Sequence, residues 1–100
     1  MKIFIDSAVV SEIKTAYDTG LIDGVTTNPT LIMKSGKHPE TVYQELIDLG
    51  INDVSMEVVG NAETMIADGR RLFNKFGKAA TIKVPCTPDG LLACKQLSRE

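Results

Sequence analysis

The chain contains little of what would define several functional classes. Among its 100 residues there is no tryptophan and there are only two cysteines, Cys86 and Cys94. Two cysteines are too few for a disulfide scaffold. If the segment after Lys83 is helical, at 1.5 Å per residue they lie about 12 Å apart, too far for a bridge. Free thiols and the lack of a recognisable signal peptide make the cytoplasm the expected location.

A basic stripe and a long apolar run are also missing. The 11 lysines and arginines are scattered among 13 acidic residues, and the net charge is -2, so nucleic acid is not an expected partner. No apolar run approaches the roughly 20 residues that cross a bilayer, so no membrane association is expected. The single histidine, His38, has no clustered ligand types around it, and is expected at the surface where a helix begins. Neither a metal nor a cofactor is expected.

Apolar residues instead recur in a rhythm of short strands followed by helices. Ser7 is expected to cap the first helix, and Met65, Ile66, Leu72, Phe73 and Phe76 to form the buried stripe of the fourth. The alternation predicts an α/β fold, with a parallel sheet and right-handed crossovers, in one domain over residues 1–100. Strands are predicted at 2–6, 25–27, 53–59 and 79–85, and helices at 7–19, 30–35, 39–49, 62–76 and 89–99.

Polar and apolar residues also alternate within each strand. An open sheet that is covered on both faces would be apolar on both. Polar residues on one face, concentrated at the carboxyl ends of the strands, instead fit the lumen of a (β/α)8 barrel. Such a barrel needs about 250 residues, so this chain is expected to form four of the eight units, a half barrel. The residues predicted to face the lumen are Phe4, Asp6, Thr26, Asn28, Ser55, Glu57, Thr81 and Lys83.

Lys83 stands inside the apolar run 79–85, which otherwise predicts a buried strand. Burying an unpaired ammonium is costly, and a lysine in such surroundings has a lowered pKa, as an amine nucleophile requires near neutral pH. Asp6 and Glu57 stand near the ends of two other strands. One amine and two carboxylates suggest Schiff-base carbonyl chemistry. The alternatives are an ordinary salt-bridged or snorkelling lysine, a helix N-cap at Asp6, and a Glu57 that only pairs with Lys83.

Three strings carry a resemblance to a known family. The segment Asp23-Gly24-Val25-Thr26-Thr27-Asn28-Pro29-Thr30-Leu31, with Phe4-Ile5-Asp6 and Ile82-Lys83-Val84-Pro85, resembles the transaldolase family. The similarity is greatest to short transaldolases and fructose-6-phosphate aldolases, and it runs from Met1 to the end of the chain. The resemblance implies a barrel enzyme that transfers a dihydroxyacetone unit from a ketose phosphate to an aldose phosphate. The transfer would pass through a lysine Schiff base, in the pentose phosphate pathway and without a cofactor.

The resemblance also implies a role for each site residue. Lys83 would attack the ketone, and Asp6 would be the acid/base that takes and returns the hydroxyl proton. Glu57, with Thr26, would hold the water that shuttles protons while the carbinolamine forms and collapses. Asn28 would bind substrate hydroxyls, although Asn28-Pro29 is also ordinary turn chemistry. Glutamate rather than glutamine at position 57 favours a transaldolase over a simple aldolase.

The chain departs from the family pattern in lacking the second four units, which supply the phosphate-binding residues. Its first and fourth strands would be exposed edges, able to pair with another chain. Two copies closing one barrel would make a homo-oligomer, and a piece of a longer gene product is the alternative. Two competing functions stay open: a non-catalytic half barrel, and a fructose-6-phosphate aldolase without an acceptor.

Overall fold

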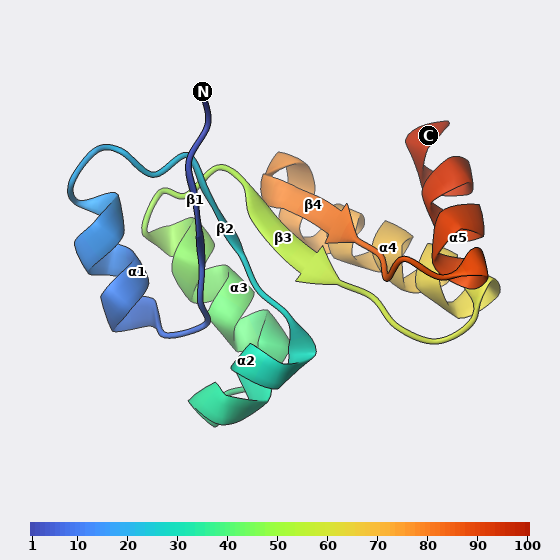
Figure 1. Ribbon diagram of the computed structural model, residues 1–100, viewed down its shortest axis with the longest axis horizontal. Coiled ribbons are helices and arrows are strands. Elements are labelled where there is room, and N and C mark those ends of the chain that lie inside the picture. Colours follow the sequence, from blue (N-terminus) through green and yellow to red (C-terminus); the bar gives the residue numbers. More distant parts are fainter.

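The computed structural model describes residues 1–100 and shows one four-stranded parallel sheet in the order β1-β2-β3-β4 (Figure 1). Each strand is followed by at least one helix, which confirms the predicted α/β fold of four successive βα units. The strands are β1 (Phe4–Asp6), β2 (Gly24–Thr26), β3 (Val54–Glu57) and β4 (Ala80–Lys83). The helices are α1 (Val10–Tyr17), α2 (Pro29–Ser35), α3 (Pro39–Asp48), α4 (Ala62–Phe76) and α5 (Pro88–Ser98), with a 3-10 turn η1 (Gly77–Ala79).

Proline and a capping side chain begin three of these helices. Proline at the first helical position has a suitable φ and no N–H to satisfy. Asn28 Oδ1 accepts from the Leu31 N–H ahead of α2, and Thr87 Oγ1 accepts from the Gly90 N–H ahead of α5. His38 is exposed, and its Nδ1 accepts from a main-chain N–H of α3, which confirms its predicted place at a helix start.

The start of the first helix differs from the prediction. Its N-cap position is Val9, and no side chain caps it. Ser7 Oγ instead accepts a hydrogen bond of 3.0 Å from the Val9 N–H, which forms a turn and delays the helix. The expected Ser7 cap is therefore wrong. Asp6 does not cap this helix either, because its Oδ1 accepts from the Thr26 hydroxyl.

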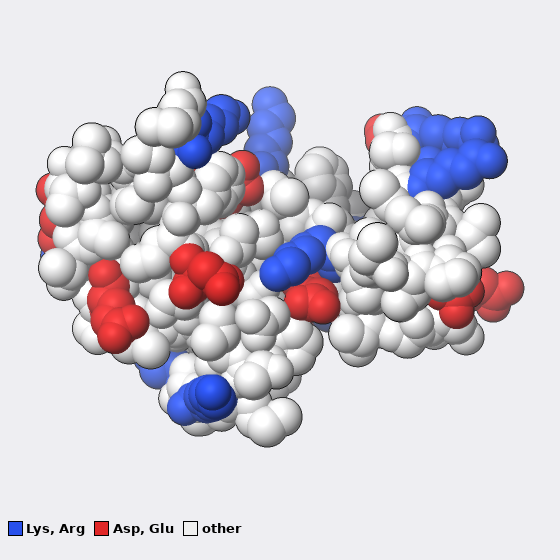
Figure 2. All heavy atoms as spheres, in the orientation of Figure 1, with Lys and Arg blue, Asp and Glu red and all other residues white.

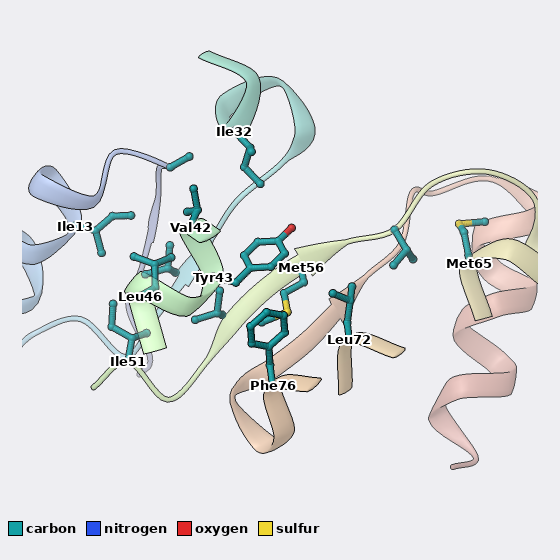
Figure 3. Packing of buried hydrophobic residues seen from close by; sticks show 14 of the residues in the cluster. Ile13, Ile32, Val42, Tyr43, Leu46, Ile51, Met56, Met65, Leu72 and Phe76 are labelled. Carbon is teal, nitrogen blue, oxygen red and sulfur yellow. The ribbon is translucent and has the colours of Figure 1, made fainter. Parts of the chain in front are cut away.

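The buried core lies between the sheet and the helices that cover one of its faces. In Figure 1, α3 and α4 run behind the strands, and the facing side of the sheet carries no helix over its middle. Tyr43 and Phe76 pack edge to face at 5.9 Å between ring centroids, in the same buried cluster as Met56 of β3 (Figure 3). Phe73, predicted to be buried, is 50% exposed, because it lines an open groove with Ile82 of β4 and Leu97 of α5. No helix is both long and apolar enough to cross a bilayer.

Candidate functional site

The strand register gathers the predicted site residues on the uncovered face of the sheet. Pairing aligns one row across all four strands, and a second row lies two residues nearer the carboxyl ends. Parallel strands present residues of one row on the same face. The site residues therefore occupy neighbouring positions at the carboxyl-end half of this face. The first row is Asp6, Thr26, Ser55 and Thr81, and the second contains Glu57 and Lys83.

Lys83 and Glu57 are direct cross-strand neighbours. Their charged atoms, Lys83 Nζ and Glu57 Oε2, lie 3.9 Å apart, with 40% and 18% of the respective side chains exposed. Lys83 Nζ also donates a hydrogen bond of 3.2 Å to the main-chain oxygen of Thr27. The amine is thus hydrogen-bonded to the Thr27 carbonyl and has the Glu57 carboxylate as its charged neighbour. Since 3.9 Å is too long for a hydrogen bond, the carboxylate remains able to bind another donor.

The expected burial of Lys83 is wrong for this chain. At 40% exposure its amine is in contact with solvent, and the β4 residues around it are only partly buried. β4 is the last strand of the sheet and has a neighbour on one side only. Nothing covers the polar face in front of it. Excluding water from the amine would therefore require further strands and loops on that side.

Asp6 is held by its neighbour in the same row. Thr26 Oγ1 donates to Asp6 Oδ1 at 2.8 Å, while Asp6 itself is exposed. Asp6 lies on the first strand and Lys83 on the fourth. Three spacings of about 4.8 Å place these strands about 14 Å apart along the sheet. The structure therefore does not bring the two into contact, and a substrate that touches both would have to reach from the first strand to the fourth.

One of the two polar groups of the Asn28 side chain is already hydrogen-bonded to the main chain. Its Oδ1 caps α2 by accepting from the Leu31 N–H at 2.9 Å, as the turn alternative predicted. The Nδ2 group makes no hydrogen bond within the protein and belongs to a half-buried residue at the end of β2. Asn28 can therefore bind a substrate oxygen through Nδ2 while Oδ1 keeps the loop in place.

Two residues beside this site were not found from the sequence. Thr27 is 0% exposed, and its Oγ1 donates to the Ser55 carbonyl at 3.0 Å. Tyr43 is 3% exposed, and burial, with the charge of Glu57 adding to it, raises the pKa of its hydroxyl above the ordinary 10.0. The sequence did contain a signal for Thr27. A threonine on the buried face of a strand needs a hydrogen-bond partner for its hydroxyl, which indicates a specific contact.

Two grooves lie outside the uncovered face. One of about 330 Å³ reaches Glu57 from the helix side, past Tyr43 and Arg71, but the Arg71 guanidinium is already paired with Glu40 and Asp68. Another of about 510 Å³ lies between α4, β4 and α5 and contains none of the predicted site residues. No three histidine, cysteine, aspartate or glutamate side chains are grouped to hold a metal ion.

Comparison with known proteins agrees with this arrangement. A family model described as Transaldolase/Fructose-6-phosphate aldolase matches residues 3–100. A probable transaldolase of Nitrosopumilus maritimus is 46% identical over 101 aligned residues, covering 100% of this chain and 45% of the relative. Probable transaldolases of Geobacter sulfurreducens and Aquifex aeolicus are 50% and 46% identical, each over 100% of this chain and 47% or 46% of the relative. The chain thus spans about half the length of these relatives, which confirms the predicted half barrel.

Proposed function

The chain belongs to the transaldolase/fructose-6-phosphate aldolase family, and on that basis we propose that it carries the Schiff-base half of a transaldolase active site. The observation that supports this proposal is the position of Lys83 beside Glu57, 3.9 Å apart at the carboxyl ends of neighbouring strands. Barrel enzymes place their chemistry at that end of the strands. The substrates would be sugar phosphates, and the enzyme would act in the cytoplasm within the pentose phosphate pathway.

The reaction follows from the residues on the uncovered face. The lone pair of Lys83 Nζ adds to the ketone carbon of a ketose phosphate, and loss of water from the carbinolamine gives the Schiff base. Asp6 takes the proton of the substrate hydroxyl as the adjacent carbon–carbon bond breaks, and an aldose phosphate leaves. The dihydroxyacetone unit left on Lys83 adds to the aldehyde of a second aldose phosphate, Asp6 returns the proton, and hydrolysis frees the lysine.

Glu57 and Asn28 would support these steps. A carboxylate near Lys83 Nζ can hold the water that delivers and removes protons as the carbinolamine forms and collapses. Thr26, which already donates to Asp6, would keep the acid/base in place. The free Nδ2 of Asn28 would bind the hydroxyls of the dihydroxyacetone unit. Glutamate at position 57 supports transfer to an acceptor over simple aldol cleavage.

The proposed activity needs a closed barrel. The 40% exposure of Lys83 and the unpaired outer edges of β1 and β4 mark where further strands would add. We propose that four more βα units complete the lumen and supply the phosphate site, from additional chain or from a second copy in a homo-oligomer. The same exposure supports the second candidate, a half barrel that folds without turning over substrate.

A donor–acceptor assay separates the candidates. The chain is incubated with fructose 6-phosphate, with and without an aldose phosphate acceptor, and its size is measured by gel filtration. A longer ketose phosphate formed only with acceptor supports the transaldolase, and free dihydroxyacetone without acceptor supports the aldolase. Neither product, from folded protein, supports the non-catalytic half barrel. Lys83→Met is the control, and a 10.8 kDa monomer that is fully active would exclude closure by a second copy.

A further inference from the structure

We propose that Thr27 is a positioning residue that aims the amine of Lys83 through its main-chain carbonyl. The inference rests on the proposed function of Lys83 as the nucleophile. Thr27 O accepts from Lys83 Nζ at 3.2 Å, and this is the only hydrogen bond that the amine makes within the protein. The carbonyl therefore decides where the end of a long and otherwise solvent-exposed side chain lies.

The side chain of Thr27 holds its own main-chain carbonyl in place. Thr27 is 0% exposed, and its Oγ1 donates 3.0 Å to the Ser55 carbonyl, which ties the end of β2 to β3. A buried β-branched side chain that is hydrogen-bonded to the neighbouring strand has little freedom to rotate.

The next residue fixes the same peptide group from the other side. Asn28 Oδ1 accepts from the Leu31 N–H, and Asn28 O accepts from the Ile32 N–H, which starts the first turn of α2. The plane between Thr27 and Asn28 is rigid, so holding both residues sets the direction of the carbonyl. The acceptor for Lys83 is thereby built into the junction of β2, β3 and α2.

This geometry gives the carbonyl two tasks. Before reaction, it holds one amine hydrogen at the inner side of the sheet, so that the lone pair of the neutral amine can face the uncovered side where a ketone would bind. After the loss of water, the protonated Schiff-base nitrogen keeps a single hydrogen, and the Thr27 carbonyl is the acceptor already in place for it. Aligning a nucleophile with its target raises the rate without adding a catalytic group.

The test compares the reactivity of Lys83 in matched variants. Thr27→Val removes the hydroxyl but keeps the shape of the side chain, whereas Thr27→Ser keeps the hydroxyl. Thr15→Val is the matched control, because Thr15 Oγ1 also donates 3.0 Å to a main-chain carbonyl, but on exposed α1. Each protein is labelled with trace acetic anhydride, and acetylation of every lysine is measured by peptide mapping. Each is also incubated with dihydroxyacetone and borohydride, and the rate of adduct formation on Lys83 is measured.

The two readouts are expected to move in opposite directions in Thr27→Val. Acetylation of Lys83 should rise about threefold to tenfold relative to the other lysines, the ratio expected when one hydrogen bond of ordinary net strength is weakened. Adduct formation should slow by a similar factor, because a freed amine is less well aligned. Thr27→Ser and Thr15→Val should behave as wild type. A merely structural role for Thr27 would not separate the two readouts.

Unchanged acetylation of Lys83 in folded Thr27→Val would overturn the inference. If that variant does not fold, Thr27→Ala replaces it, with Thr15→Ala as its control. Thr27→Ala also removes the hydroxyl that donates to the Ser55 carbonyl, so it should raise acetylation of Lys83 about threefold or more, and no change would overturn the inference. If wild type forms no adduct, the proposed function fails, while the acetylation comparison still decides the role of Thr27.

Discussion

The two faces of the sheet are built from alternate residues of the same strands, yet they differ in almost every property. On the helix-covered face, Val25, Val54 and Met56 are fully buried among apolar side chains. On the other face, Asp6 and Thr81 are exposed, and Lys83 keeps 40% of its side chain in solvent. Figure 2 shows that the uncovered side presents isolated charges on a largely uncharged surface. Because successive side chains of a strand point to opposite faces, the same strands serve two purposes. One face stabilises the chain, and the other carries the reactive groups.

The largest expected effect is on the covered face. Met56→Ala removes a fully buried side chain from the cluster that contains Tyr43 and Phe76, and should lower the free energy of unfolding by about 2–5 kcal/mol. Thr81→Ala on the uncovered face is the counterpart. It removes an exposed hydrogen bond to Asp53 and should cost about 1 kcal/mol or less. Urea unfolding of both variants checks this, and equal losses would show that the two faces contribute alike.

A substitution in the first turn of α5 tests how the loop after β4 is held. A Cβ at Gly90 would overlap the Pro85 carbonyl oxygen, so Gly90→Ala should force the loop after β4 to shift and cost about 1–3 kcal/mol. Gly69→Ala is the matched helix variant, because its Cβ would meet side-chain atoms and no backbone, with Leu97 Cδ1 at 2.9 Å and Ile82 Cγ2 at 3.2 Å. Thermal unfolding compares them. A Gly90→Ala protein as stable as Gly69→Ala would mean that the loop is not fixed by this contact.

A smaller effect is expected for an ion cluster on the helix layer. Hydrogen bonds from Lys75 and then Arg71 lower the pKa of Glu40 from its ordinary 4.5. Because the folded pKa is the lower one, this group adds stability above about 4.5, and the contribution disappears as pH falls through the folded pKa. Wild type should exceed Glu40→Gln by about 1 kcal/mol or less near neutral pH. Unfolding measured from neutral to acidic pH should show this difference vanish in acid, and a constant difference would refute the linkage.

The smallest expected effect on stability is at the proposed nucleophile. Lys83→Met removes one hydrogen bond to the Thr27 carbonyl and a carboxylate neighbour at 3.9 Å, so the free energy of unfolding should change by less than about 1 kcal/mol. Since 40% of the side chain is in solvent, little stabilisation follows from removing its charge. Calorimetry against wild type checks this. A loss comparable to that of Met56→Ala would mean that Lys83 is part of the structural core.

Much of the fold follows from local chemistry that the sequence displays. Pro29 and Pro39 begin α2 and α3, at or within one residue of the predicted helix starts, and strand alternation assigned Val25 and Glu57 to opposite faces. The start of α1 was mispredicted, because Ser7 can either cap a helix or form a turn, and only the contact with Val9 decides between them. Local competition of this kind is not resolved by residue type alone.

The site was only partly predictable, since its details depend on distant segments. The pairing of Lys83 with Glu57 follows from register, but the burial of Lys83 depends on what lies beyond β4. The hydrogen bond from Lys83 to Thr27 joins residues 56 positions apart, through a main-chain atom that every residue has. No residue type marks such an acceptor, and only the fold brings it to the amine. Alternation predicted which face is reactive, but not how its lysine is held.

Reductive trapping decides whether Lys83 forms a Schiff base. The folded chain is incubated with fructose 6-phosphate and then borohydride, and its intact mass and peptide map are measured beside Lys83→Met. Wild type should carry a dihydroxyacetone-sized adduct on Lys83, and the variant should carry none. A folded wild-type chain without an adduct, or with adducts spread equally over exposed lysines such as Lys14 and Lys95, would contradict the claim that the uncovered face is a Schiff-base site.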